Sequence, residues 1–292
     1  AAIYGANASG KSNLHIAMQI FQRIIKESLN NVYDSEEHAI SVYYRPFEFS
    51  DETENTEFEI IVILDNYEYI YGFDYNDIRI ESEWMYRKNI ITNRKTIIFE
   101  RDKDNIELGP SVKRICDNYK EQIPSETLAL SFFSRLKLRT DIFTSLYQCI
   151  IMDMLVAKTD SFENPTIIEK FLPNIIDNYK EDLLNFLYAI DVGIKDIVYE
   201  ENNNEISFWT THCDENGNPY YISLYGESEG TLKSIAIFIY ARASILNDRI
   251  MFVDELNIKL HPLLLKFIID LFYDKNSKAQ LIYTTHDTTL LD

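Results

Sequence analysis

The chain has 292 residues, 46% of them hydrophobic, which is enough to bury a sizeable core in one large domain or in two lobes. Its 47 acidic residues outnumber its 28 basic ones and give a formal net charge of -19, which disfavours a broad, sequence-independent DNA-binding surface. No run of residues approaches the ~18 apolar residues of a membrane-spanning helix, so we expect a cytoplasmic protein with no membrane segment.

The cysteines Cys116, Cys149 and Cys213 are widely spaced and odd in number. This pattern favours neither a disulfide framework nor a zinc site. We expect all three to be small buried groups in a reducing compartment.

The first predicted element is a strand ending at Tyr4, followed by a glycine loop and a helix over residues 13–29. The loop, Gly5-Ala6-Asn7-Ala8-Ser9-Gly10-Lys11-Ser12, matches the phosphate-loop pattern G-x-x-x-x-G-K-[ST] at every fixed position. Strand, loop and helix are the context that this pattern requires. The residues predicted to bind a nucleotide here are Gly5, Asn7, Ala8, Ser9, Gly10, Lys11, Ser12 and Asn13.

The residue types in this loop suit a polyphosphate. The two glycines let successive backbone N–H groups turn toward an anion at the helix N-terminus. Lys11 is predicted to contact the β- and γ-phosphates, and the Ser12 hydroxyl to be a ligand of Mg²⁺. The alternative is a glycine turn that only caps a helix.

Residues 51–110 predict an antiparallel β lobe of about six strands. Alternating residues at 58–64 and 67–75, separated by Asp65-Asn66, indicate a hairpin. One face of its second strand carries Tyr67, Tyr69, Tyr71, Phe73 and Tyr75. Such a stripe could stack bases, but we interpret it as a packed sheet face.

Residues 111–192 read mostly as helix and predict an inserted helical lobe, in which apolar spacing continues through residues 142–155. No long heptad run supports a coiled-coil arm. Residues 193–292 begin with strands and then alternate helix and strand, with helices at 229–246 and 261–273 and strands at 250–253 and 280–283. This alternation predicts a mostly parallel core sheet that also holds the strand before the glycine loop.

Two carboxylates, Asp254 and Glu255, end the apolar strand at 250–253. Asp254 is predicted to hold Mg²⁺ beside Ser12, through water. Glu255 is positioned to orient or deprotonate the water that attacks the γ-phosphate. His261, just before Pro262, is interpreted as a helix cap rather than a catalytic group.

His286 follows the last predicted strand, at the sheet edge where ligands bind in open α/β folds. A neutral imidazole there can hydrogen-bond the γ-phosphate and the attacking water. The predicted catalytic residues are therefore Lys11, Glu255 and His286.

A second anion site is predicted in Gly226-Glu227-Ser228-Glu229-Gly230-Thr231, hereafter the Ser-x-Gly turn, which opens the helix at 229–246. Ser228 and Gly230 lie at a helix N-terminus, where free N–H groups and the helix dipole attract anions. Because the glycine loop already provides one phosphate site, a second suggests that two chains share a nucleotide. The alternative is an ordinary serine-capped helix.

The order of these motifs resembles that of ABC-type ATPase heads, including RecF-like, structural-maintenance-of-chromosomes and overcoming-lysogenization-defect proteins. More closely, Gly-Ala-Asn-Ala-Ser-Gly-Lys-Ser-Asn-Leu, Ser-Glu-Gly-Thr and Asp-Glu-Leu-Asn-x-x-Leu-His-Pro-Leu are similar to motifs of small bacterial AAA family ATPases of abortive-infection and other antiphage operons. The resemblance spans the whole chain.

This resemblance implies a P-loop NTPase fold of ABC-ATPase type forming one head over residues 1–292. Its parts would be the P-loop and first helix (1–50), the β lobe (51–110), the helical insertion (111–192) and the remainder (193–292). It also implies ATP and Mg²⁺ as ligands and a head-to-tail dimer in which Ser228 and Gly230 contact the γ-phosphate held by the partner's Lys11. An effector, a nuclease or a toxin would be a further partner.

Two departures from the family pattern are visible. An acidic residue, Glu229, stands where transporter signatures have glycine, so a transporter is not indicated. No glutamine is assigned to the Mg²⁺-sensing loop, for which Gln122 and Gln148 are positional candidates only.

We therefore expect a Mg²⁺-ATPase that dimerises around ATP and controls an effector, in bacterial antiphage defence by resemblance. One rival is a nucleotide-gated scaffold with negligible turnover, because the same residues bind and hydrolyse ATP. Another is a RecF-like DNA-repair ATPase, which the acidic balance and the missing coiled coil disfavour.

Overall fold

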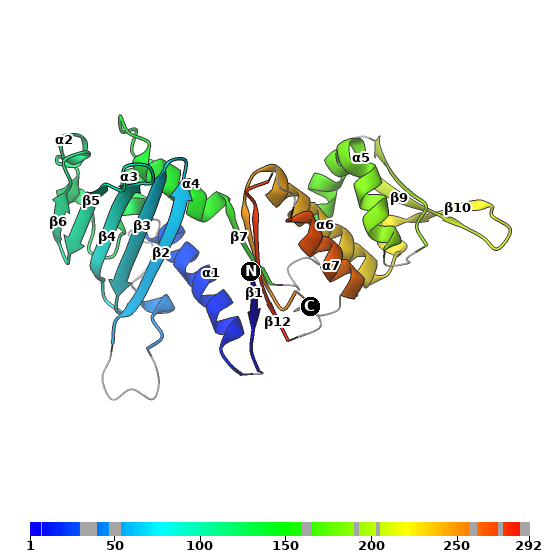
Figure 1. The fold of residues 1–292 in the computed structure, drawn as a ribbon, viewed down its shortest axis with the longest axis horizontal. Helices are drawn as coiled ribbons and strands as arrows, with labels where there is room; N and C mark the ends of the chain where they lie inside the picture. Colours follow the sequence, from blue (N-terminus) through cyan, green and yellow to red (C-terminus); the bar gives the residue numbers. More distant parts are fainter. Residues whose placement is uncertain are drawn as a thin grey trace. The chain divides into compact units, whose positions relative to one another are not determined.

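The structure is a computed structural model that describes residues 1–6, 8–29, 40–46, 54–158, 165–189, 193–202, 205–256, 262–273 and 277–286. The chain forms two compact units, and Figure 1 shows their helices and strands. Unit 1 comprises residues 1–16 and 153–292, and unit 2 comprises residues 17–152.

The central sheet of unit 1 has four strands in the order β1-β12-β11-β7. These are β1 (Ala2–Tyr4), β12 (Gln280–Thr285), β11 (Ile250–Asp254) and β7 (Met154–Lys158), and each neighbouring pair is parallel. Parallel strands place their carboxyl ends at one edge, so the segments that follow β1, β11 and β12 meet there. The predicted parallel core is confirmed.

Strand β7 corrects one sequence-based expectation. Apolar spacing predicted a helix through residue 155, but α4 ends at Met152 and Met154 begins β7. The strand pairs with β11, from Ile250 opposite Met154 to Val253 opposite Ala157. The four apolar residues 154–157 fit helix and strand patterns equally, and only a partner far away in the sequence decides between them.

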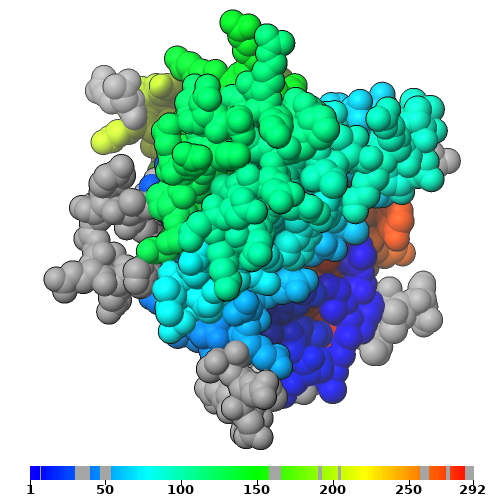
Figure 2. Space-filling view, turned by 90° about the vertical axis from the view of Figure 1, so that its left-hand side faces the viewer, coloured from blue at the N-terminus to red at the C-terminus, as the bar shows by residue number. Residues whose placement is uncertain are grey.

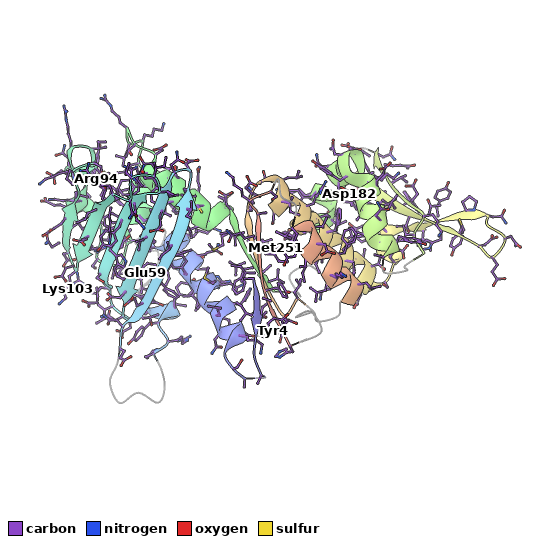
Figure 3. All side chains as sticks on the ribbon, viewed as in Figure 1. Tyr4, Glu59, Arg94, Lys103, Asp182 and Met251 are labelled. Carbon is purple, nitrogen blue, oxygen red and sulfur yellow. The ribbon has the colours of Figure 1, made fainter. Side chains whose placement is uncertain are left out.

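Three helices belong to unit 1: α5 (Pro165–Tyr188), α6 (Glu229–Leu246) and α7 (Pro262–Leu271). Helix α6 is buried over most of its length, including Ile235 and Phe238, as expected of a helix that is apolar on all sides. It packs in one core with Met251 of β11, which Figure 3 labels. Asp182 of α5, also labelled there, pairs with Arg242 of α6 at 2.8 Å.

A second sheet in unit 1 is antiparallel, with the order β10-β9-β8. It consists of β8 (Asp196–Asn202), β9 (Glu205–Cys213) and β10 (Pro219–Ser223). Strand β10 continues through the short 3-10 helix η4 (Leu224–Gly226) into the Ser-x-Gly turn and α6. This sheet therefore lies directly before the predicted second anion site in the chain.

Unit 2 contains an antiparallel sheet in the order β2-β3-β4-β5-β6. Where the sequence predicted about six strands, the described residues form five: β2 (Thr56–Leu64), β3 (Tyr67–Tyr75), β4 (Ile80–Asn89), β5 (Lys95–Asp102) and β6 (Asn105–Leu108). In the aromatic stripe, Tyr71, Phe73 and Tyr75 are fully buried and Tyr69 nearly so. The interpretation of this stripe as a packed sheet face is confirmed.

The helical elements that the structure describes in this part of the chain are α1 (Lys11–Glu27), η1 (Ser41–Tyr43), α2 (Lys113–Cys116), η2 (Lys120–Gln122), α3 (Ala129–Arg135) and α4 (Ile142–Met152). Residues of α1, α2, α3 and α4 pack in one core with the sheet. The rings of Phe21 in α1 and Phe73 in β3 stack with centroids 5.7 Å apart. Residues of this unit, cyan to green, form most of the surface that faces the reader in Figure 2.

None of the three cysteines forms a disulfide bond: Cys116 and Cys149 are buried as expected, whereas Cys213 is exposed. The expectation that all three are buried is wrong for Cys213, because it ends β9 on the sheet β8–β10 rather than in a core. Among the residues that the structure describes, no helix is both long and apolar enough to cross a membrane.

Candidate functional site

The glycine loop lies between β1 and α1. Gly10 has a φ of +90° and Ala8 a φ of 61°, which is the left-handed region that favours glycine. A Cβ on Gly5 would come within 2.4 Å of Ser9 Oγ. The loop shape therefore requires glycine at 5 and 10, as the phosphate-loop pattern does. Asn7, also predicted to bind the nucleotide, lies outside the described residues.

Lys11 is folded over this loop. Its Nζ donates hydrogen bonds to the carbonyl oxygens of Gly5, at 2.7 Å, and Ala6, at 2.8 Å. The residue is only 8% exposed, so the ammonium group is held at the loop by its own backbone. The loop thus carries a positive charge at the position where the sequence predicts phosphates.

The ends of β11 and β12 are joined through Thr284. Its Oγ1 donates to Oδ1 of Asp254 at 2.7 Å and accepts a hydrogen bond from the backbone N–H of Glu255, also at 2.7 Å. The N–H of Leu256 donates to the carbonyl oxygen of Thr284 at 3.2 Å. Both Asp254 and Thr284 are buried, so these contacts fix the point where β11 ends.

Glu255 and His286 face each other beyond this junction. Glu255 Oε1 and His286 Nε2 are 3.6 Å apart, and both side chains are about one third exposed. The φ of Glu255 is 54°, a costly conformation for a residue with a side chain, and Thr284 holds it in place. Such strain is common at functional sites, where the surrounding structure fixes a side chain in one orientation.

A cavity of about 590 Å³ brings most of the predicted residues together. Its lining is Ala8, Ser9, Gly10, Lys11, Ser12, Asn13, Glu255 and His286. The lining residues before position 14 and the two that follow β11 and β12 are far apart in the sequence, and they meet at the carboxyl edge of the parallel sheet. Gln122 and Gln148, the candidates for a Mg²⁺-sensing glutamine, are not among the described residues that line it.

The donor set suits Mg²⁺ rather than a transition metal. Within the described residues, no group of three or more His, Cys, Asp or Glu side chains could hold a metal ion by itself. Mg²⁺ typically takes only one or two protein oxygens, together with water and substrate phosphates. The Ser12 hydroxyl and the Asp254 carboxylate are such oxygens. Asp254 is 5% exposed and does not line the cavity, which fits a ligand that acts through water.

Ser228 and Gly230 do not line this cavity either. Ser228 is the N-cap of α6, and its Oγ accepts a hydrogen bond from the N–H of Thr231 at 3.1 Å. Both residues are exposed. A Cβ on Gly230 would meet nothing closer than 3.7 Å, so the chain's own packing does not require glycine there.

Sequence reasoning missed two features of these sites. Thr284 was not singled out from the sequence, although a threonine at a strand end that precedes a predicted catalytic residue was a usable signal. The contacts of Glu227 with Thr210 and His212 were also missed, because no sequence spacing connects β9 with the Ser-x-Gly turn.

Comparisons with known proteins give a family. The model of a family described as "AAA domain, putative AbiEii toxin, Type IV TA system" matches residues 1–292. The solved structure titled "Crystal structure of the SmcHead bound to the C-winged helix domain of ScpA" is 16% identical, with a TM-score of 0.40, over 99% of this chain and 82% of that one. The SMC head domain from Thermotoga maritima is 11% identical, with a TM-score of 0.33, over 99% and 81%. No curated protein matches.

Proposed function

The chain belongs to this family of AAA domains, and on that premise we propose that it is a Mg²⁺-dependent ATPase whose ATP-bound form is a dimer that controls an effector. The observation that carries the proposal is the single cavity into which Lys11, Glu255 and His286 all project. This cavity combines the ammonium group of Lys11, which can bind phosphates, with the carboxylate of Glu255, which can accept a proton from water.

Nucleotide binding uses the loop and the start of α1. The free N–H groups of the first helical turn and the helix dipole favour an anion at this place. Lys11 exchanges its bonds to the carbonyl oxygens of Gly5 and Ala6 for bonds to phosphate oxygens. The Ser12 hydroxyl and the Asp254 carboxylate would hold Mg²⁺, which would supply positive charge that offsets the charge of the phosphates.

Hydrolysis uses Glu255 and His286, which line the same cavity as the glycine loop. Glu255 accepts a proton from a water molecule as the water oxygen bonds to the γ-phosphorus. The bond from the γ-phosphorus to the bridging oxygen breaks, and ADP and phosphate are released. His286, 3.6 Å from Glu255, hydrogen-bonds the water or the γ-phosphate and keeps the two in line.

The second copy completes the pocket in this proposal. Ser228 and Gly230 are exposed and lie away from their own chain's cavity, so they are available to a nucleotide bound by another chain. Ser228 Oγ accepts a hydrogen bond from the N–H of Thr231. In the hydrogen bond between the hydroxyl groups of Ser228 and Thr231, either oxygen can be the donor. When Thr231 donates, the Ser228 hydroxyl proton is available for a phosphate oxygen. ATP then lies between two chains, and its hydrolysis separates them.

The family description supports the role in controlling an effector, because it names a toxin and a type IV toxin–antitoxin system. We propose that opening and closing of the dimer regulates such an effector, in antiphage defence. Nothing in the cavity distinguishes a motor that turns over from a scaffold that only binds ATP, so turnover has to be measured.

Phosphate release tests the proposal directly. The wild-type chain should release phosphate from ATP in the presence of Mg²⁺, and Lys11→Ala should lose both release and nucleotide binding. A mixture of Lys11→Ala and Ser228→Ala chains should regain activity, because a mixed dimer contains one complete site. Binding without release by the wild-type chain would indicate the scaffold, and failure of the mixture would refute the shared pocket.

A further inference from the structure

Glu227 lies immediately before Ser228, and its side chain is only 10% exposed. Glu227 Oε1 accepts a hydrogen bond from Oγ1 of Thr210 at 2.5 Å and lies 2.7 Å from Nε2 of His212. Both partners come from the neighbouring strand β9. These two contacts hold the carboxylate against the sheet that precedes the Ser-x-Gly turn.

The partners of Glu227 are themselves fixed. Thr210 is fully buried, and its Oγ1, whose proton goes to Glu227, also lies 3.3 Å from the carbonyl oxygen of Ile222 on β10. The ring of His212 stacks on Tyr220, with centroids 5.7 Å apart. Strand β9 therefore holds Glu227 directly, and β10 contacts the two residues that hold it.

The backbone of Glu227 is held as well. Its N–H donates to the carbonyl oxygen of Leu224 at 3.1 Å, which closes η4. Glu227 and Ser228 both have extended conformations, with φ and ψ of -72° and 169° for Glu227 and -65° and 150° for Ser228. The chain thus runs straight from the anchored carboxylate to the N-cap of α6.

We propose that Glu227 is a positioning residue for the shared nucleotide pocket. By binding Thr210 and His212, it holds the Ser-x-Gly turn extended, so that Ser228 and Gly230 reach a triphosphate bound by the second copy. The sheet β8–β10 is then the support of this half of the pocket. This inference rests on the proposed function, because it concerns how that pocket is assembled.

Mixing variants tests whether Glu227 acts on the partner's nucleotide. Glu227→Ala should release little phosphate by itself, and so should Lys11→Ala. In a mixed dimer, the intact glycine loop of the Glu227→Ala chain faces the intact Ser-x-Gly turn of the Lys11→Ala chain, so activity should return. If Glu227 served its own chain's cavity, no site in the mixture would be complete and activity would stay low.

Conservative variants separate positioning from folding. Thr210→Val removes the hydroxyl and keeps the shape, whereas the matched control Thr210→Ser keeps the hydroxyl. We expect Glu227→Ala and Thr210→Val to raise the ATP concentration for half-maximal dimerisation about 10-fold to 100-fold, as the loss of a hydrogen bond to a charged group implies. Thr210→Ser should stay near the wild type, and binding of a fluorescent ATP analogue to the monomer should be unchanged in all three.

The outcomes are distinct. Activity in the Lys11→Ala and Glu227→Ala mixture, with unchanged monomer binding, supports the inference. If Lys11→Ala with Ser228→Ala regains activity but Lys11→Ala with Glu227→Ala does not, the shared pocket stands and the role of Glu227 is refuted. If neither mixture regains activity, the shared pocket fails, and the inference fails with it.

Discussion

Thr284 and Asp254 are joined by a buried hydrogen bond of 2.7 Å that connects the ends of β11 and β12. The same hydroxyl accepts the N–H of Glu255, so one side chain positions both predicted carboxylates. The predicted metal ligand and the proposed general base are therefore both held by a residue that is not among the described residues that line the cavity.

Removing this hydroxyl should disturb both carboxylates. Thr284→Val keeps the shape but leaves the Glu255 N–H and an Asp254 oxygen without this partner, at a cost of about 1–3 kcal/mol for each buried group. We expect a lower melting temperature and a larger loss of kcat than of ATP affinity. Thr284→Ser is the control and should retain most activity; equal losses in both variants would refute the role of the hydroxyl.

Glu255→Gln should separate chemistry from binding. The amide cannot accept the proton of the attacking water, so phosphate release should fall by about 10²-fold or more. ATP binding should persist, because Lys11 and the loop amides are unchanged. Release measured with a phosphate sensor, together with binding measured by calorimetry, checks this. Retained turnover would remove Glu255 from the catalytic residues.

The glycine loop should respond to substitutions according to its backbone angles. Gly10→Ala forces a side chain into a φ of +90°, and although no atom lies within 4 Å of the new Cβ, the left-handed conformation costs about 1–2 kcal/mol. Ala8→Gly at a φ of 61° should be neutral or stabilising. Thermal unfolding without nucleotide measures both, and the reverse order would contradict the backbone described here.

The stability of unit 2 should depend on the buried ion pair of Glu83 and Arg101. Glu83 accepts hydrogen bonds from the N–H groups of Ala129 and Leu130 and from the hydroxyl of Tyr71, and lies 3.8 Å from Arg101. Burial raises the pKa of Glu83, with the charge of Arg101 opposing this shift.

Glu83→Ala should leave a buried guanidinium group without its carboxylate and destabilise the fold by about 3–5 kcal/mol. Denaturant unfolding measures the loss. The exposed Glu57, on β2 of the same sheet, provides the control as Glu57→Ala, which should change the free energy of unfolding by less than about 0.5 kcal/mol. Similar losses in the two variants would contradict the role assigned to burial.

The sequence predicted the elements whose pattern is local. The glycine loop, the hairpin at 56–75 and helix α6 were recognisable because each carries its own periodicity or turn residues. Strand β7 was not, since Met154–Lys158 continues the apolar spacing of α4 and becomes a strand only by pairing with β11.

The candidate site also divides into residues that a local motif predicts and residues whose role depends on distant contacts. Lys11, Glu255 and His286 could be predicted from motifs, and the parallel sheet explains why they meet. The supports could not, because the contacts of Thr284 with Asp254 and of Thr210 and His212 with Glu227 depend on which strands and turns become neighbours. Motifs thus identify the residues that are predicted to touch a ligand, and tertiary structure identifies the residues that hold them.

The most direct test of the account is the mass of the Glu255→Gln chain in solution with ATP and Mg²⁺, measured by light scattering. We expect twice the monomer mass with ATP and the monomer mass with ADP. Gly230→Arg, added to the same chain, should prevent dimerisation by placing a large side chain in the proposed contact with the partner. Nucleotide binding by the monomer should be kept, because the fold of the single chain leaves room for a side chain at position 230. A Glu255→Gln chain that stays monomeric with saturating ATP, or a Gly230→Arg chain that dimerises as well, would contradict the shared pocket.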